Sequence, residues 1–177
     1  DAFESSRTRE DVFTAADGAE QKTDFMHRTE EGGYRKGDGY TAASRSLNYG
    51  RMVFVLPDQG VTPESLLQQQ GFLAELTGDY SAAELVWSVP KFDVKSSTEL
   101  NGVLQALGVT DAFDMTKADF TPLTDNGAFL RSAMQAARVK IDEEGVEAAA
   151  YTEIVCADSA MMEVPPTVEM DLDRPFL

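Results

Sequence analysis

One stretch near the C-terminal end constrains the fold most, because its own preference disagrees with that of the residues before it. Residues 142–152 read Asp-Glu-Glu-Gly-Val-Glu-Ala-Ala-Ala-Tyr-Thr, and alanine and glutamate in a row favour helix. Residues 137–141 instead alternate apolar and basic side chains, which predicts a strand. Gly145 lies between the two patterns and permits backbone angles that other residues avoid.

As a strand, this stretch would have one small, nearly apolar face and one mostly polar face. The first face would carry Val146, Ala148, Ala150 and Thr152, and the second would carry Glu147, Ala149, Tyr151 and Glu153. Such a segment could enter a sheet between existing strands without steric cost, or stay outside as a loop or loose helix. A segment with two acceptable positions is a candidate conformational switch.

Several short motifs accompany this stretch in a fixed order along the whole chain. They are Phe3 with Thr8–Phe13, Met52–Pro57, Val89–Phe92, Leu107–Val109, Ala112-Phe113, Ala118–Phe120, Pro165-Pro166 and Arg174–Leu177. Together with residues 143–152, they make the sequence resemble the serpins, whose hinge pattern reads Glu-Glu-Gly-Thr-Glu-Ala-Ala-Ala-Ala-Thr. The resemblance implies that residues 1–177 are part of a single serpin domain with a reactive-centre loop at about 143–166.

The resemblance also implies an α+β fold, with multi-strand mixed sheets and helices. It implies an incomplete serpin fold that lacks the N-terminal half and the last hairpin. The residue patterns agree with this class. Strands are expected over 22–29, 40–49, 84–95 and 128–141, and turns at 31–33 and 37–39.

The apolar run Met52–Leu56 predicts a strand that is buried on both faces. Thr62-Pro63-Glu64 predicts a helix start, with Leu66 and Leu67 facing inward. Residues 72–76 predict a second short helix. Ser96–Glu99 fits a capping box for a helix over 100–107.

Composition excludes several classes of partner. The chain has 31 acidic and 15 basic residues and a net charge of −16, which argues against binding nucleic acid or an anionic membrane surface. No apolar run approaches the roughly 20 residues that span a bilayer. A single cysteine rules out an internal disulfide framework.

The residues needed for an enzyme or a metal site are absent. The one histidine, His27, lies in a charged context and is expected at the surface. No nucleophile elbow, dinucleotide fingerprint or P-loop occurs, and His and Cys are too few for a metal centre. Asp142, Glu143 and Glu144 would point alternately along a strand and would not converge on one ion. We therefore predict no enzymatic activity, no metal and no cofactor.

The resemblance assigns roles to residues at the root of the loop. The hinge is Glu143, Glu144, Gly145, Val146, Glu147, Ala148, Ala149 and Ala150, and a hinge-anchoring ion pair is expected between Lys91 and Glu143. Two positions depart from the family pattern. Gln135 stands where many members have histidine, at the gate through which the loop would enter the sheet. Glutamine keeps hydrogen bonding there, but the gate would lose a titrating group. Val146 replaces threonine but is also β-branched and of similar volume.

The position of the reactive bond depends on the direction of counting. Counting forward from Gly145 places it at Ser159-Ala160, and counting back from Pro165-Pro166 places it nearer Met162-Glu163, with Met161 and Met162 as alternative residues. Each choice offers a small or unbranched residue and no basic one. The target is therefore expected to be elastase-like, chymotrypsin-like or subtilisin-like. Cys156 would be exposed in such a loop, either as an oxidisable thiol or as a passive one.

The resemblance implies inhibition of a serine protease by a suicide-substrate mechanism, with a covalent acyl complex between the two proteins. It also implies an extracellular or secreted location. The alternative is a non-inhibitory serpin-fold protein that binds a ligand or partner or acts as a chaperone. A third interpretation is an incomplete product with no activity of its own.

Overall fold

The structure is a computed structural model that describes residues 3–47, 50–144 and 165–177. By its internal contacts the chain divides into two compact units. The larger unit comprises residues 1–92 and 141–177, and the smaller unit comprises residues 93–140. Mixed sheets with a few short helices confirm the predicted α+β class.

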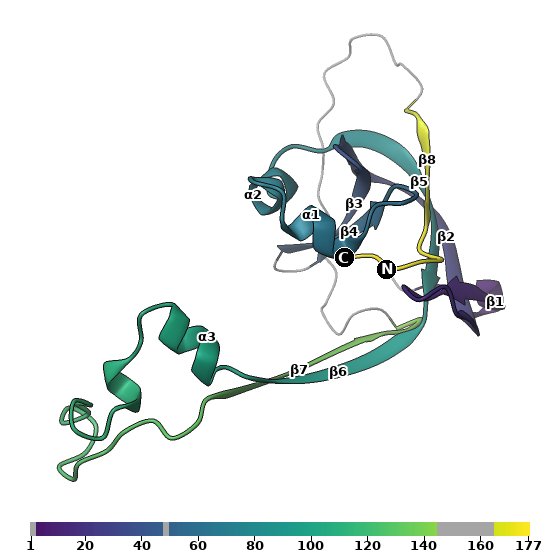
Figure 1. The fold of residues 1–177 in the computed structure, drawn as a ribbon. Coiled ribbons are helices and arrows are strands. Elements are labelled where there is room, and N and C mark those ends of the chain that lie inside the picture. The colour runs from purple at the N-terminus through teal and green to yellow at the C-terminus, as the bar shows by residue number, and fades with distance from the viewer. Residues whose placement is uncertain (1–2, 48–49, 145–164) are drawn as a thin grey trace. The chain divides into compact units, whose positions relative to one another are not determined.

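The larger unit is built on a sheet in which one long strand, β2 (Glu20–Gly37), pairs with three neighbours (Figure 1). Among the described residues the sheet runs β4-β3-β2-β5-β8, and β1 also pairs with β2. All these pairings are antiparallel except that of β5 with β8, which is parallel. The remaining strands are β1 (Arg9–Thr14), β3 (Tyr40–Leu47), β4 (Gly50–Pro57), β5 (Ser81–Pro90) and β8 (Thr167–Asp171).

The length of β2 corrects the predicted turn at 31–33. Gly32 and Gly33 lie inside the strand, opposite residues of β5. A Cβ atom on Gly32 would come within 2.6 Å of a Leu85 methyl carbon, and one on Gly33 within 2.9 Å of the Tyr80 Cβ. The two glycines therefore serve close packing rather than chain reversal. The second predicted turn is confirmed, since Gly39 takes a φ of 80° between β2 and β3.

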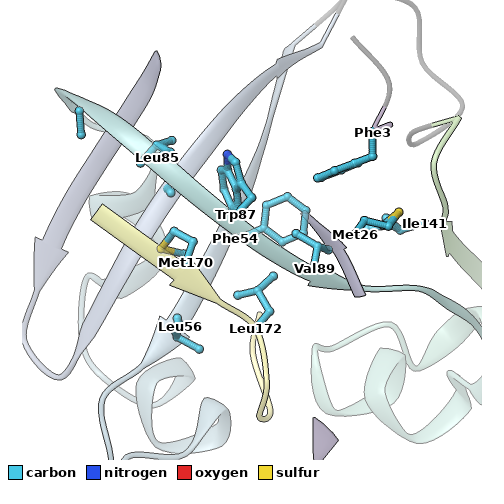
Figure 2. Packing of buried hydrophobic residues seen from close by; sticks show 12 residues of the cluster. Phe3, Met26, Phe54, Leu56, Leu85, Trp87, Val89, Ile141, Met170 and Leu172 are labelled. Atoms are coloured by element: carbon cyan, nitrogen blue, oxygen red, sulfur yellow. The ribbon is translucent and has the colours of Figure 1, made fainter. Parts of the chain in front are cut away.

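Strand β4 confirms the prediction of burial on both faces, because its side chains enter two different hydrophobic clusters. Phe54 and Leu56 belong to the first cluster, and Val55 belongs to the second. Trp87 is the largest fully buried side chain of the first cluster, and its ring meets that of Phe54 edge-on at 5.4 Å (Figure 2). The alternating side chains of one strand thus hold two cores together.

Two short helices, α1 (Pro63–Leu67) and α2 (Phe72–Leu76), close the second cluster. Thr62 caps α1 as predicted, with its hydroxyl accepting from the Ser65 N–H. Leu66 is fully buried, but Leu67 is 51% exposed, so the prediction that both leucines face inward was wrong for Leu67. Neighbouring residues on a helix point about 100° apart, and a single turn cannot bury both.

The smaller unit contains α3 (Asn101–Ala106) and nearly all of the two-stranded sheet formed by β6 (Phe92–Glu99) and β7 (Met134–Ile141). The predicted capping box at Ser96–Glu99 was wrong, because these residues belong to β6 and α3 begins without a side-chain cap. Strand pairing with β7 outweighs the local capping preference. The Arg138 guanidinium joins the two strands through two 2.6 Å hydrogen bonds to Asp93.

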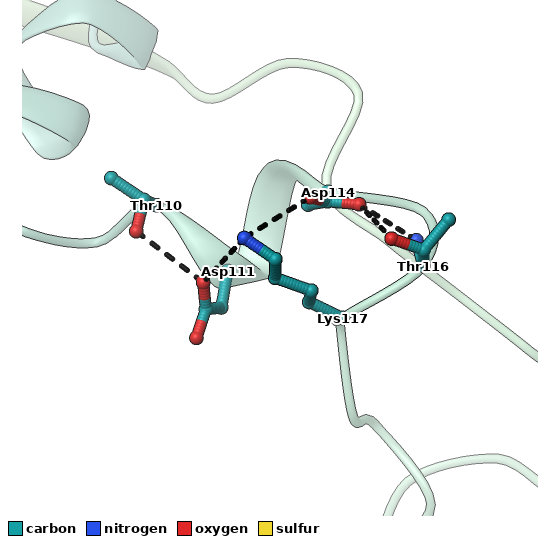
Figure 3. Close-up of polar contacts among 5 residues, drawn as sticks. All are labelled: Thr110, Asp111, Asp114, Thr116 and Lys117. Atoms are coloured by element: carbon teal, nitrogen blue, oxygen red, sulfur yellow. Dashed lines mark hydrogen bonds and ion pairs between the residues drawn. The ribbon is translucent and has the colours of Figure 1, made fainter.

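Short-range hydrogen bonds order the segment between α3 and β7, which also contains the 3-10 helix η2 (Asp111–Phe113). Asp114 accepts from the Thr116 N–H at 2.8 Å and from its hydroxyl at 2.7 Å, while Lys117 approaches Asp114 at 3.6 Å (Figure 3). Asp119 and Thr121 repeat this turn. All of residues 93–140 are described, and none of them is buried, so the bonds that order this segment are local ones.

The two leucines of α1 give a matched test of the second cluster. We expect Leu66→Ala to lower the free energy of unfolding by about 2–5 kcal/mol, because it empties a fully buried site. We expect Leu67→Ala to change it by no more than about 0.5 kcal/mol. Urea denaturation of both variants measures the difference, and equal losses would contradict the orientation of α1.

Candidate functional site

The candidate site surrounds Glu143, the first residue of the expected hinge. Glu143 lies two residues beyond the end of β7, in a turn that the Asp142 side chain closes by accepting the Glu144 N–H at 3.0 Å. Such a side-chain turn ends the strand locally. Glu143 itself belongs to the larger unit.

Lys91 approaches Glu143 from the junction of β5 and β6. Its own N–H donates to the Asp24 carbonyl of β2 at 2.8 Å, which fixes the backbone at this junction. The Lys91 Nζ lies 3.0 Å from Glu143 Oε1 and 2.9 Å from Oε2. Both side chains are partly buried, at 34% and 22% exposure. The structure therefore brings together the two residues of the expected ion pair.

Two residues from the start of the chain complete the site, and neither was predicted to contact Glu143. Thr8, between η1 (Ser5–Arg7) and β1, donates its hydroxyl to Glu143 Oε1 at 3.0 Å. The Phe3 N–H donates to the Glu143 carbonyl at 2.9 Å. Both residues occur in motifs that carry the family resemblance, but a separation of more than 130 residues leaves no periodic signal that would pair them.

These contacts shift the pKa values of the ion pair in opposite directions. The hydrogen bond from Lys91, with further help from Thr8, lowers the pKa of Glu143 below its ordinary value of 4.5. The hydrogen bond to Glu143 raises the pKa of Lys91 above 10.5, aided by the charges of Glu143, Asp24 and Asp142. The charged forms of both partners are thus favoured across the neutral range.

His27 lies beside this site and is less exposed than the predicted surface position. It lines an open depression of about 320 Å³ together with Ser6, Arg7, Thr8 and Arg9. Its Nε2 is enclosed and has no hydrogen-bond partner among the described residues. Burial, followed by the charge of Arg9, lowers the pKa of His27. The expected surface histidine is therefore partly buried.

The remaining residues of the expected loop lie outside the described residues. They are Gly145, Val146, Glu147, Ala148, Ala149 and Ala150 of the hinge, Cys156, and the two reactive-bond candidates Ser159-Ala160 and Met161-Met162. Of the hinge, the structure describes Glu143 and Glu144. Gln135, the departure from the family pattern at the gate, is exposed on β7.

Neither a metal site nor a membrane-spanning helix occurs in the described part of the chain. No group of three or more His, Cys, Asp or Glu side chains there is arranged to hold an ion. No helix in residues 3–47, 50–144 or 165–177 is long and apolar enough to cross a bilayer.

Comparison with known proteins gives the family. The model of the serpin family, described as serine protease inhibitors, matches residues 1–177. Serpin-Z1C of Triticum aestivum is 30% identical over 193 residues, covering 100% of this chain and 48% of that protein. Serpin B6 of Pongo abelii is 29% identical over 188 residues, covering 99% and 48%. The chain therefore belongs to the serpin family, whose members are known as protease inhibitors rather than as enzymes.

Solved structures agree with this assignment. The thermophilic serpin tengpin in its native state matches with a TM-score of 0.76 and 27% identity over 99% of this chain and 46% of that one. Thyroxine-binding globulin in complex with thyroxine matches with a TM-score of 0.76 and 26% identity over 99% and 47%. The chain thus spans about half the length of the relatives that it matches.

The pKa shifts predict how stability depends on pH. Because the pKa of Glu143 is lowered by folding, its contribution is complete above pH 4.5 and is lost as the pH falls through the folded value. Because the pKa of Lys91 is raised, its contribution is complete below pH 10.5 and is lost as the pH rises through the folded value.

We therefore expect Glu143→Gln to flatten the fall in unfolding free energy between about pH 5 and pH 3. Glu144→Gln is the matched control, because it removes the neighbouring carboxylate, which is exposed, and leaves the Glu143 contacts intact. Thermal unfolding at a series of pH values measures both. The same acid slope in wild type and Glu143→Gln would show that the ion pair does not contribute.

Proposed function

We propose that the complete protein carrying this chain inhibits a serine protease as a suicide substrate. Its reactive-centre loop, about residues 143–166, would be the segment that the protease recognises and cleaves. Family membership supports protease inhibition in general. The observation that carries the proposal is the hinge composition, which is small and uncharged at Val146, Ala148 and Ala150. The contacts at the loop root, where Glu143 is held by Lys91, Thr8 and Phe3, would keep the intact loop outside the sheet until cleavage.

In the proposed mechanism the protease serine attacks the carbonyl carbon of the scissile bond, at Ser159-Ala160 or near Met161-Met162. The serine oxygen forms an ester with the new C-terminus, and the released amine is the new N-terminus of the remaining chain. The freed segment from about Gly145 then enters the sheet beside β7 as an additional strand. Displacement of the tethered protease distorts its catalytic geometry, so that water no longer hydrolyses the ester.

The hinge composition supports insertion on physical grounds. Val146, Ala148 and Ala150 would form the buried face, and none of them is charged or proline. Each backbone hydrogen bond formed by an added strand contributes about 1 kcal/mol net. Tengpin, one of the solved relatives, is known in a native and in a latent state, which supports a fold with two long-lived conformations in this family.

The Lys91–Glu143 pair is proposed to hold the loop root while the sheet is closed. Breaking the pair exposes two charges that had shared hydrogen bonds. The intact pair therefore favours the closed position but does not prevent release of the loop. The target is proposed to be elastase-like, chymotrypsin-like or subtilisin-like, since neither candidate bond follows a basic residue. We also propose an extracellular or secreted location, on family grounds, and no cofactor.

A second candidate function is non-inhibitory binding of a ligand or partner, or a chaperone role. Its support is the likeness to thyroxine-binding globulin, which is as similar in fold and identity as tengpin is. A shared fold does not fix the activity. The two candidates differ in what cleavage of the loop does to stability.

The inhibitory proposal predicts a covalent complex between the complete protein and a chymotrypsin-like protease that survives denaturing electrophoresis. Val146→Arg should convert the inhibitor into a substrate, because a buried charge opposes insertion. Tyr151→Arg is the matched control, since position 151 is expected on the outward face and inhibition should persist. Undiminished inhibition by Val146→Arg would count against insertion.

Loop cleavage gives an independent test between the two candidates. If the cleaved segment inserts, the melting temperature should rise sharply, because each of the several backbone hydrogen bonds of the added strand contributes about 1 kcal/mol net. A non-inhibitory protein should show almost no change. Calorimetry of the complete protein before and after nicking by a non-target protease measures this.

A further inference from the structure

Phe3 contacts the hinge root with its backbone and the hydrophobic core with its ring. Its N–H donates to the Glu143 carbonyl at 2.9 Å, and its side chain is only 5% exposed, in the cluster that contains Met26 and Ile141 (Figure 2). Because the ring and the N–H belong to the same residue, a restraint on the ring also limits the movement of the N–H.

The Arg45 side chain of β3 covers that ring. Its guanidinium carbon lies 4.7 Å from the centroid of Phe3, within the range of a cation–π contact. Only 17% of the Arg45 side chain is exposed. Partial removal from water strengthens the attraction between the cation and the ring face.

Glu30 of β2 orients the Arg45 guanidinium. Glu30 Oε1 lies 2.8 Å from Arg45 Nε, and Glu30 Oε2 lies 3.4 Å from Arg45 Nη2. Arg28 Nε approaches the same Oε2 at 2.7 Å. A two-point contact of this kind fixes the plane of a guanidinium, which the single point charge of a lysine cannot do.

We propose that Arg45 is a positioning residue for the hinge. Glu30 fixes the plane of the Arg45 guanidinium, and the guanidinium restrains the Phe3 ring. The restrained ring in turn keeps the Phe3 N–H hydrogen-bonded to the Glu143 carbonyl. The role in inhibition rests on the function proposed above. Glu143 is then restrained through two separate routes, by Lys91 and Thr8 at its carboxylate and by the Glu30–Arg45–Phe3 series at its main chain. The ease of opening the loop root depends on both.

The direct test is hydrogen exchange at the Phe3 amide in the complete protein. We expect Arg45→Met to accelerate exchange there about five- to thirtyfold, the factor that corresponds to loss of a partly desolvated cation–π contact. The Leu172 amide, which donates to the Ser88 carbonyl at 2.9 Å, is the internal reference and should be unchanged. Equal acceleration at both amides would mean general destabilisation and would overturn the proposal.

Arg51→Met is the matched control. The Arg51 guanidinium lies over the Tyr80 ring at the same 4.7 Å distance but contacts the end of α2 rather than the hinge. It should leave the Phe3 amide unchanged. Arg45→Lys should retain only part of the protection of the Phe3 amide. If Arg45→Met fails to fold, Glu30→Gln serves as the test instead, because it keeps the arginine, and it should also accelerate exchange at Phe3. An unchanged Phe3 amide in folded variants would overturn the proposal.

A second measurement separates this inference from the inhibitory function. With a target protease, Arg45→Met should lower the number of inhibitor molecules consumed per covalent complex, because a looser loop root inserts sooner. If wild type forms no complex but the Phe3 amide responds as expected, the inhibitory function fails and the positioning role stands. If complexes form and neither the amide nor the stoichiometry responds, the positioning role alone fails.

Discussion

Glu143 ties together parts of the chain that are far apart in sequence. Its carboxylate accepts from Thr8, which is 135 residues away, and from Lys91, and its carbonyl accepts from Phe3. Among the described residues of the candidate site, Lys91, Thr8 and Phe3 meet only at this residue. Strand β7 ends where these contacts begin, and the expected loop starts there. A single glutamate thus marks the boundary between strand β7 and the segment proposed to move.

The sequence predicted what local patterns encode and missed what packing decides. The apolar run of β4 was enough to predict burial on both faces, and Thr62 was enough to predict the start of α1. The continuation of β2 through Gly32 and Gly33 was not predictable, because it depends on Leu85 and Tyr80 across the sheet. Ser96–Glu99 fits a cap by residue type, but partners in β7 make it a strand. Phe3 and Thr8 reach Glu143 only through the tertiary fold.

In this family the shared fold does not by itself determine the activity. Tengpin and thyroxine-binding globulin match the chain with the same TM-score and nearly equal identity, so the architecture alone does not decide between protease inhibition and ligand binding. What distinguishes the two is the chemistry of a few residues. Under the proposed mechanism, small uncharged side chains in the hinge would favour insertion, while the contacts of Glu143 and Arg45 would oppose it. Activity is proposed to arise from the balance between these opposing tendencies.

The parallel pairing of β8 with β5 has a consequence for any molecule cut before residue 165. Five residue pairs join these strands, Leu177 exchanges two backbone hydrogen bonds with Val55, at 2.7 and 3.0 Å, and Arg174 donates to the Pro57 carbonyl at 3.1 Å. Met170 and Leu172 are fully buried. The C-terminal piece would therefore remain docked after scission, and the nicked protein would migrate as one particle in native gels and as two polypeptides in detergent.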